Sequence, residues 1–240
     1  MNTDGGGRAW FDRLDESVGA VSFDLFGTLV TVDRPPEPDD AVAAALRERD
    51  VPVPADWSAA YRTAHVETEP LAELPLHEHV MAALRSRAAD STEDGAATVP
   101  DKIDEVTIRE AVQDAFHTPL ATRPGAAAAI EALAERVPVG VLSNSSVEGL
   151  VARTIDRSDV PGEALAVVRA SVEIGWRKPH ERAFRAVAAD LGVDPDRLLH
   201  VGDDPRTDGA ADRVCAGAVL VDEEGPLDLA TALEEHGWLQ

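Results

Sequence analysis

The sequence is poor in cysteine, in lysine and in long apolar runs, and each shortage excludes a class of protein. A single cysteine, Cys215, excludes an internal disulfide framework and a cysteine-based zinc site. No run approaches the roughly 18 apolar residues of a transmembrane helix, so we expect no membrane span. Residues 1–13 are glycine-rich and charged, unlike the apolar stretch of a secretory signal. We therefore expect a soluble, cytoplasmic protein.

Basic residues are scarce as well: 22 lysines and arginines stand against 45 aspartates and glutamates, for a net charge of −23. A surface of this sign repels phosphate backbones, so we expect neither nucleic acid nor an anionic membrane as a partner. Only two of the basic residues, Lys102 and Lys178, are lysines. This composition resembles that of proteins from halophilic archaea, in which carboxylates keep the surface hydrated in molar salt. An ordinary acidic protein is the alternative.

The pattern of apolar residues divides the chain into two parts. In the C-terminal half, apolar runs alternate with helical patterns, and a further apolar run covers residues 18–23. Such alternation predicts a parallel sheet with helices on both faces. Residues 34–121 are mostly helical in pattern, although 88–102 have no core-forming periodicity and are predicted to be a flexible insertion. We therefore predict an α/β core of residues 1–33 and 122–240 with an inserted helical region between them.

The expected elements of the C-terminal half follow from hydrophobic periodicity and from turn residues. Strands are predicted over residues 137–142, 164–168, 198–201 and 218–221. Helices are predicted over residues 126–136, 147–155, 181–191, 207–216 and 227–236.

Polar side chains follow three of the predicted strands. Asp24 comes directly after one strand, Ser143 and Asn144 after the next, and Asp203 after a third. Ligands of open α/β sheets bind at the carboxyl ends of the strands, so these side chains are expected in one crevice, with Lys178 in reach. A carboxylate, a hydroxyl and an ammonium together suit phosphoryl transfer, and paired carboxylates suit Mg²⁺.

Four short motifs stand in order along the chain: Asp24-Leu-Phe-Gly-Thr-Leu29, Leu142-Ser143-Asn144, Lys178-Pro179, and Gly202-Asp203 followed by Asp208. Their order and their places at predicted strand ends or on a loop resemble the four motifs of the haloacid dehalogenase superfamily of hydrolases. The resemblance implies a Rossmann-like core, a parallel sheet with helices on both faces. It also implies an α-helical cap inserted between the first two motifs, where residues 34–121 lie.

The resemblance also implies a role for each matching residue. Asp24 would be the nucleophile, and Ser143 and Lys178 would bind the transferring group. Substrate binding would further involve Thr28 and Asn144. Four groups would hold Mg²⁺: Asp24, the backbone carbonyl of Phe26, Asp203 and Asp208, the last of which would support either Asp203 or Lys178.

Phe26 departs from the pattern of the family's phosphatases, which usually have an aspartate two residues after the nucleophile. That aspartate is a general acid and base, a role that contributes roughly 10²–10⁴ in rate, and phenylalanine performs neither part. The dehalogenase branch has an aromatic residue there, but it needs no metal and usually lacks acids such as Asp203 and Asp204. Phosphonate-cleaving members use a cap lysine, for which Lys102 beside the predicted insertion is a poor candidate.

We therefore predict a Mg²⁺-dependent phosphatase that acts on a small phosphorylated metabolite through an aspartyl-phosphate intermediate. Its partner would be a small-molecule phosphate ester, and the oligomeric state stays open. The alternatives are a metal-independent 2-haloacid dehalogenase and a non-catalytic binding protein that retains the fold. If another residue protonates the leaving group, four in the inserted region are the first candidates: His65, Glu67, His77 and His79.

The charge balance gives a first testable prediction. At molar salt the Debye length is only about 3 Å, so repulsion among the surface carboxylates is screened. We expect the Tm to rise as KCl increases from low to molar concentration, measured by calorimetry at constant pH. A matched series in sucrose controls for effects of water activity. A Tm that stays flat or falls in KCl contradicts the halophilic interpretation.

Overall fold

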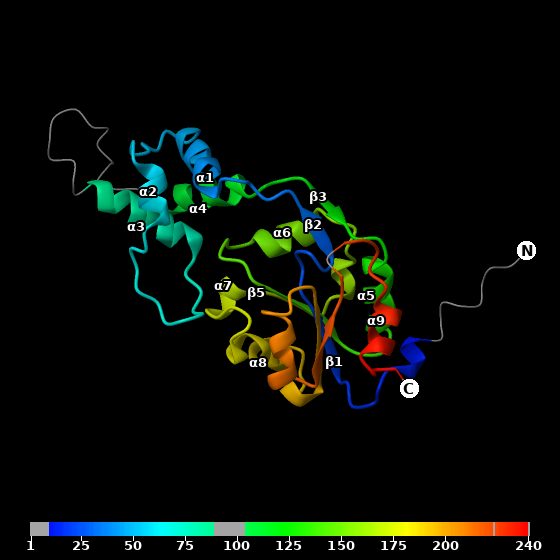
Figure 1. Ribbon diagram of the computed structural model, residues 1–240. Helices are drawn as coiled ribbons and strands as arrows, with labels where there is room; N and C mark the ends of the chain where they lie inside the picture. The colour runs from blue at the N-terminus through cyan, green and yellow to red at the C-terminus, as the bar shows by residue number, and fades with distance from the viewer. Residues whose placement is uncertain (1–9, 89–103, 223, 240) are drawn as a thin grey trace, which may run out of the picture.

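The computed structural model describes residues 10–88, 104–222 and 224–239. Five parallel strands form one sheet in the order β5-β4-β1-β6-β7 (Figure 1). The strands are β1 (Ala20–Phe23), β4 (Val139–Ser143), β5 (Val167–Ala170), β6 (Leu198–Gly202) and β7 (Gly217–Leu220). The predicted Rossmann-like α/β fold is confirmed.

Helices cover both faces of this sheet, as predicted (Figure 1). They are α5 (Ala126–Ala134), α6 (Leu150–Asp156), α7 (Ser171–Ile174), α8 (Glu181–Asp190) and α9 (Leu229–Glu235). Side chains of β1 alternate between the faces: Phe23 packs with α5, α6 and α9, whereas Ala20 packs with α8. Short 3₁₀ helices cover Phe11–Arg13, Gly162–Ala164 and Pro195–Arg197.

The register of the central strands determines where the functional side chains emerge. Phe23, the last residue of β1, lies opposite Val141 of β4 and Val201 of β6. The next residues of the three strands therefore reach the same edge of the sheet. All four residues of β1 are buried, because this strand has a neighbour on each side and helices over both faces.

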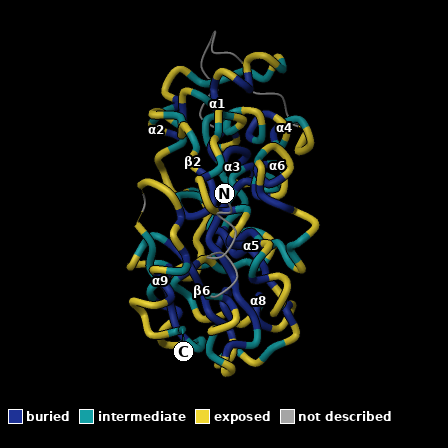
Figure 2. The backbone as a smooth tube through the Cα atoms, turned by 90° about the vertical axis from the view of Figure 1, so that its right-hand side faces the viewer, coloured by how far each residue is buried: buried dark blue, intermediate teal, exposed yellow. Residues whose placement is uncertain are grey.

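A second group of helices packs around a hydrophobic cluster of its own. It comprises α1 (Pro38–Arg47), α2 (Trp57–Arg62), α3 (Leu76–Ala88) and α4 (Glu105–Ala115), which lie together at the upper end of the molecule (Figure 2). We call residues 34–121 the helical segment. The short strands β2 (Val30–Val32) and β3 (Leu120–Thr122) pair antiparallel where the chain enters and leaves this segment.

The predicted helix 207–216 is wrong, since only the 3₁₀ helix η4 (Gly209–Arg213) forms there. Gly209 is a poor helix former, and the amides of Thr207 and Asp208 both turn back to the Asp204 carbonyl. The greater part of the predicted flexible insertion, including Lys102, lies outside the described residues.

In the part of the chain that the structure describes, no helix combines the length and the apolar character needed to cross a membrane.

Candidate active site

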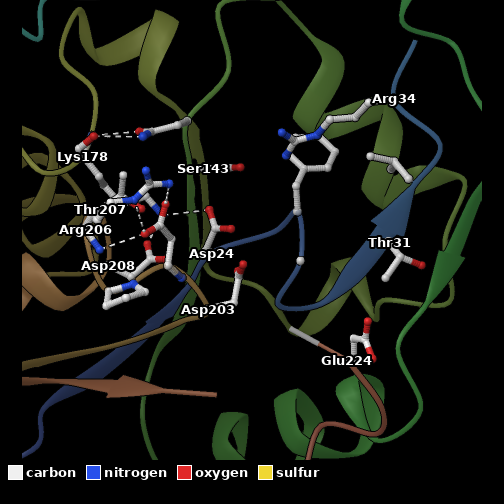
Figure 3. Close-up of a pocket in the computed structure, with 16 residues that line it drawn as sticks. Asp24, Thr31, Arg34, Ser143, Lys178, Asp203, Arg206, Thr207, Asp208 and Glu224 are labelled. Carbon is white, nitrogen blue, oxygen red and sulfur yellow. Dashed lines mark hydrogen bonds and ion pairs between the residues drawn. The ribbon is translucent and has the colours of Figure 1, made fainter. Parts of the chain in front are cut away.

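A cleft of about 980 Å³ opens at the carboxyl edge of the sheet. Asp24 follows β1, Ser143 ends β4, and Asp203 follows β6, so the three residues come from adjacent strands. Figure 3 shows their side chains facing one space, with Arg34 and Thr31 across it. The structure thus brings together the side chains that follow the predicted strands.

Lys178 occupies the centre of the charged cluster although it is only 1% exposed. Its ammonium Nζ lies 2.7 Å from Asp24 Oδ1 and 2.6 Å from Asp208 Oδ1 (Figure 3). Burying an ammonium is unfavourable unless anions surround it, and here two carboxylates do so. The ion pairs therefore determine the position of all three side chains.

Asp208 is held on all sides by partners of its own. Its Oδ1 accepts from Lys178 and from His200 Nε2, at 3.1 Å, and its Oδ2 accepts from the Asp204 amide at 3.1 Å. Ser22 Oγ lies 2.8 Å from the other ring nitrogen of His200. Of the two supporting roles predicted for Asp208, the geometry favours the one that positions Lys178.

Asp203 is oriented by the turn that follows Asp24. The Thr28 hydroxyl donates to Asp203 Oδ1 at 2.6 Å, and Thr28 is completely buried. A Cβ at Gly27 would stand 2.5 Å from Asp203 Oδ2, and the backbone of Gly27 is left-handed with φ 96°. Only glycine allows this close approach without strain.

A buried guanidinium holds the same turn from the other side. Arg123, 4% exposed, donates to the carbonyls of Gly27 at 2.8 Å, Thr28 at 3.2 Å and Gly225 at 3.2 Å. Sequence reasoning missed this residue, as it missed His200. Their signals are weak, because a lone arginine or histidine in a sequence does not show that it is buried.

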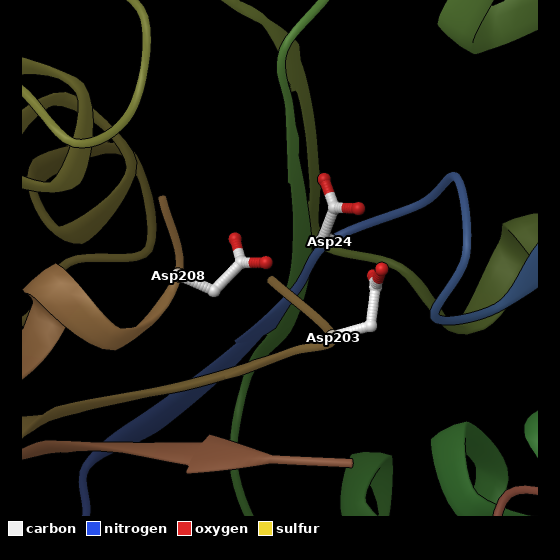
Figure 4. A group of neighbouring side chains, drawn as sticks. All are labelled: Asp24, Asp203 and Asp208. Atoms are coloured by element: carbon white, nitrogen blue, oxygen red, sulfur yellow. The ribbon is translucent and has the colours of Figure 1, made fainter. Parts of the chain in front are cut away.

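Three carboxylates, Asp24, Asp203 and Asp208, each offer an oxygen within 4.8 Å of the others (Figure 4). Hard cations such as Mg²⁺ prefer a set of oxygen ligands of this kind. Within the described residues no backbone hydrogen bond ends on the Phe26 carbonyl. Of its neighbours in the turn, Leu25 accepts two backbone hydrogen bonds and Gly27 accepts one from the Arg123 guanidinium. The donor set therefore fits a divalent cation.

Ser143 and Asn144, adjacent in sequence, have different surroundings. The Ser143 hydroxyl is buried, lines the cleft, and finds no hydrogen-bond partner among the described residues. A buried polar group without a partner is costly, so the hydroxyl is suited to a ligand in the cleft. Asn144 instead binds the backbone of Lys178 twice, through Nδ2 to the carbonyl at 2.9 Å and through Oδ1 to the amide at 2.8 Å.

The charges of the cluster shift one another's pKa values. Burial raises the pKa of the Asp24 carboxyl, and the Lys178 ammonium opposes that shift. Burial disfavours the Lys178 ammonium, but the two carboxylates outweigh burial and raise its pKa. Burial also opposes ionisation of Asp208, yet the His200 hydrogen bond and the Lys178 charge hold its pKa well below the usual range. Burial and Lys178 lower the pKa of His200, which favours the neutral ring.

A second cavity of about 270 Å³ joins the cleft at Phe26, Val32, Arg34 and Asn144. Apolar surface predominates in its wall, where Phe116, Leu120, Val147 and Leu150 lie, and the side chains of Arg157 and Arg177 also line it. Phe26, the residue that departs from the phosphatase pattern, lines both cavities. The helical segment therefore contributes directly to the space next to Asp24.

Residues 18–211 match the haloacid dehalogenase-like hydrolase family. The chain belongs to this family. The match contains all four motifs and the residues of the charged cluster. Among curated protein sequences, none is significantly similar to this hydrolase.

Solved structures share the fold of this hydrolase at low sequence identity. CbbY from Rhodobacter sphaeroides in complex with phosphate has a TM-score of 0.51 and 20% identity, over 81% of this chain and 82% of that one. The 2-haloacid dehalogenase from Pseudomonas syringae pv. Tomato has a TM-score of 0.51 and 19% identity, over 85% and 86%. These likenesses show the fold alone and do not separate a phosphatase from a dehalogenase.

The Thr28–Asp203 hydrogen bond yields a prediction about cation binding. Thr28→Val removes the hydroxyl at nearly constant volume, so Asp203 loses the donor that orients it. Partners that orient a ligand typically change metal affinity by about 10–100-fold, and we expect a loss of that size in titration calorimetry with MgCl₂. Thr31→Val, an exposed threonine of the same cleft, is the matched control. Equal affinity of the two variants would contradict the role given to Thr28.

Proposed function

We propose that this hydrolase is a Mg²⁺-dependent phosphatase that acts on a small phosphate ester through an aspartyl-phosphate intermediate. One observation carries the proposal: three carboxylates converge beside a buried ammonium and a buried hydroxyl that has no hydrogen-bond partner among the described residues. The carboxylates suit a cation, and Lys178 and Ser143 suit the oxygens of a phosphoryl group. A 2-haloacid carries a single carboxylate charge, whereas a phosphate monoester carries more charge and more oxygens and therefore uses more of this set.

In the first step Asp24 attacks phosphorus. Its Oδ1 accepts from Lys178, which leaves Oδ2 for the attack. A bond forms between Oδ2 and phosphorus while the bond from phosphorus to the leaving oxygen breaks. Lys178 and Ser143 hold the charge that develops on the phosphoryl oxygens. Mg²⁺, held by Asp24, Asp203 and the Phe26 carbonyl, would neutralise charge on the same group.

In the second step a bond forms between a water oxygen and phosphorus while the bond between phosphorus and Asp24 breaks. The Asp24 carboxylate is restored, and inorganic phosphate leaves with the protons of the water. Two residues predicted to bind substrate have other partners in the site, since Thr28 holds Asp203 and Asn144 holds the Lys178 backbone. We therefore assign both a positioning role.

Arg34 is exposed at the cleft, and within the described residues it has neither an ion pair nor a hydrogen bond. It suits an anionic group of the substrate.

The leaving group receives no proton from Phe26. The four alternative donors from the helical segment, His65, Glu67, His77 and His79, do not line the cleft either. His65 and His79 bind carbonyls of their own segment instead, those of Ala60 and Tyr61. We therefore infer that substrates have leaving groups that depart as stable anions, and the apolar second cavity suits an aryl or acyl group of this kind. The helical segment, residues 34–121, then acts as the cap that closes this cavity.

One observation favours the alternative function, a 2-haloacid dehalogenase. An aromatic ring two residues after the nucleophile, beside a mainly apolar cavity, also suits a small halogenated acid. The two functions differ in their need for a metal. Hydrolysis of an aryl phosphate that EDTA abolishes and MgCl₂ restores supports the phosphatase, whereas EDTA-resistant halide release from a 2-haloacid supports the dehalogenase.

Asp24→Asn tests the nucleophile. The amide is nearly isosteric, so the fold is retained, but it cannot form the aspartyl-phosphate. We expect aryl phosphatase activity to fall below about a tenth of the parent, and trapping with labelled substrate to find no phosphoenzyme. Glu224→Gln, which removes one carboxylate from the same cleft, is the control and retains activity. If Asp24→Asn retains more activity than the limit given for it, Asp24 is not the nucleophile.

Phe26→Asp tests the missing general acid. In the parent, rates should rise steeply as the leaving-group pKa falls, and alkyl phosphates should react slowly. The new carboxyl supplies a proton, so we expect alkyl phosphate turnover to increase by roughly 10²-fold, the lower end of such contributions. Phe26→Asn is the control, because asparagine has the size of aspartate but no acidic proton. It should show no gain in alkyl phosphate turnover. Similar parental rates on alkyl and aryl phosphates would mean that another residue supplies the proton.

A further inference from the structure

We propose that Glu73 is a positioning residue through which the helical segment holds both catalytic loops, the one after β4 with Ser143 and the one that carries Lys178. Glu73 lies on the loop between α2 and α3, which leaves the helices and runs down to α7 (Figure 1). This inference rests on the proposed function for the roles of Ser143 and Lys178.

The side chain of Glu73 is unusual for a carboxylate in an acid-rich protein, because it is only 1% exposed. A carboxylate that merely kept the surface hydrated would face solvent. Burial of the charge is unfavourable unless ion pairs and hydrogen bonds surround it. Its direct partners, Ser171 and Arg177, both lie in the connection between β5 and α8, and Ser171 links it to the loop after β4.

The first set of partners leads to Lys178. Arg177 binds Glu73 with two parallel hydrogen bonds, from Nε to Oε2 at 3.0 Å and from Nη2 to Oε1. Bidentate pairs of this kind restrict the orientation of the guanidinium as well as its position. Since Arg177 directly precedes Lys178, the carboxylate of the helical segment restrains the backbone from which the central ammonium extends.

The second set of partners leads to Ser143. The hydroxyl of Ser171, the first residue of α7, donates to Glu73 Oε2 at 2.6 Å and accepts from the Ser145 amide at 2.9 Å. Ser171 is completely buried. Ser145 lies two residues after Ser143 and directly after Asn144, which binds the Lys178 backbone. One carboxylate thus joins both loops at the positions next to their catalytic residues.

Backbone hydrogen bonds hold the Glu73 loop in register against the core. The Glu73 amide donates to the Gly175 carbonyl at 2.9 Å, and the Arg177 amide donates to the Leu71 carbonyl at 3.0 Å. Leu71 has φ 67°, a left-handed conformation that is unfavourable for leucine. Such a conformation persists only where the surrounding contacts impose it, as these two hydrogen bonds do.

The geometry distinguishes a positioning role of Glu73 from a purely structural one. A structural role needs only a strong contact between the helical segment and the core, at any place. Here both sets of partners end within two residues of a catalytic group, where a shift of about 1 Å can cost around 10²-fold in rate. A change at Glu73 should therefore alter turnover more than it alters stability or substrate affinity.

Glu73→Gln is the direct test, because it keeps the shape and an acceptor for Ser171 but removes the charge that binds Arg177. We expect kcat on an aryl phosphate with Mg²⁺ to fall about 10- to 100-fold, with a much smaller change in KM. Glu37→Gln is the matched control, since Glu37 forms an exposed ion pair with Arg62 within the helical segment. The control should retain the parental kcat.

Variants of Arg177 keep the test decisive if Glu73→Gln folds poorly. Arg177→Lys keeps the charge but loses the two parallel hydrogen bonds, and we expect a smaller loss of kcat than in Arg177→Gln. The double variant of Glu73→Gln and Arg177→Gln should lose no more than the worse single variant, because both break the same contact. Parental kcat in Glu73→Gln or in both Arg177 variants, or additive losses in the double variant, would overturn the proposal.

Amide hydrogen exchange separates this proposal from the proposed function. In Glu73→Gln, residues 143–147 and 175–178 should exchange several-fold faster than in the parent, and in Glu37→Gln they should not. The readout needs no substrate, so a parent inactive on every phosphate ester would refute the phosphatase and leave this measurement valid. Unchanged exchange in both loops would refute the role of Glu73.

Discussion

The buried ammonium of Lys178 is the interaction on which the rest of the site depends. It is stable in the interior only because Asp24 and Asp208 lie within 2.7 Å of it. Asp208 in turn needs His200 and the Asp204 amide, and the Lys178 backbone needs Asn144. A lysine at this position therefore requires most of the surrounding polar network, and a change to any member leaves a buried charge incompletely compensated.

The charges of this protein act on an anionic substrate both at long range and at short range. A protein with a net charge of −23 repels an anionic substrate over a long range in dilute salt. At molar salt the Debye length is about 3 Å, so only contacts at that distance matter. The charged groups that line the cleft, the carboxylates as well as Lys178 and Arg34, then determine the local potential. At such ionic strength an acid-rich surface is therefore compatible with the anion binding that we propose for the cleft.

Much of the fold is predictable from the sequence, because the patterns that indicate strands and helices are local. The apolar run before Asp24 becomes the central strand, and alternation with helices predicts the parallel sheet correctly. The prediction failed over residues 207–216, where the chain forms only a short 3₁₀ helix. Here the Asp204 carbonyl accepts from two successive amides, so tertiary requirements around Asp208 overrode a helical apolar pattern.

By itself the sequence determined the order of strands and helices, the excess of acids and the four motifs, which place Asp24, Ser143 and Asp203 at strand ends and Lys178 on a loop. These depend on residue type and spacing, which are properties of the chain alone. Only the tertiary structure decided the partners of these residues: Thr28 on Asp203, His200 on Asp208 and Glu73 on Arg177. Each of these pairs joins residues that come together only when separate elements pack. Spacing along the chain does not encode such a contact, because burial and ion pairing between distant residues arise from the packed fold.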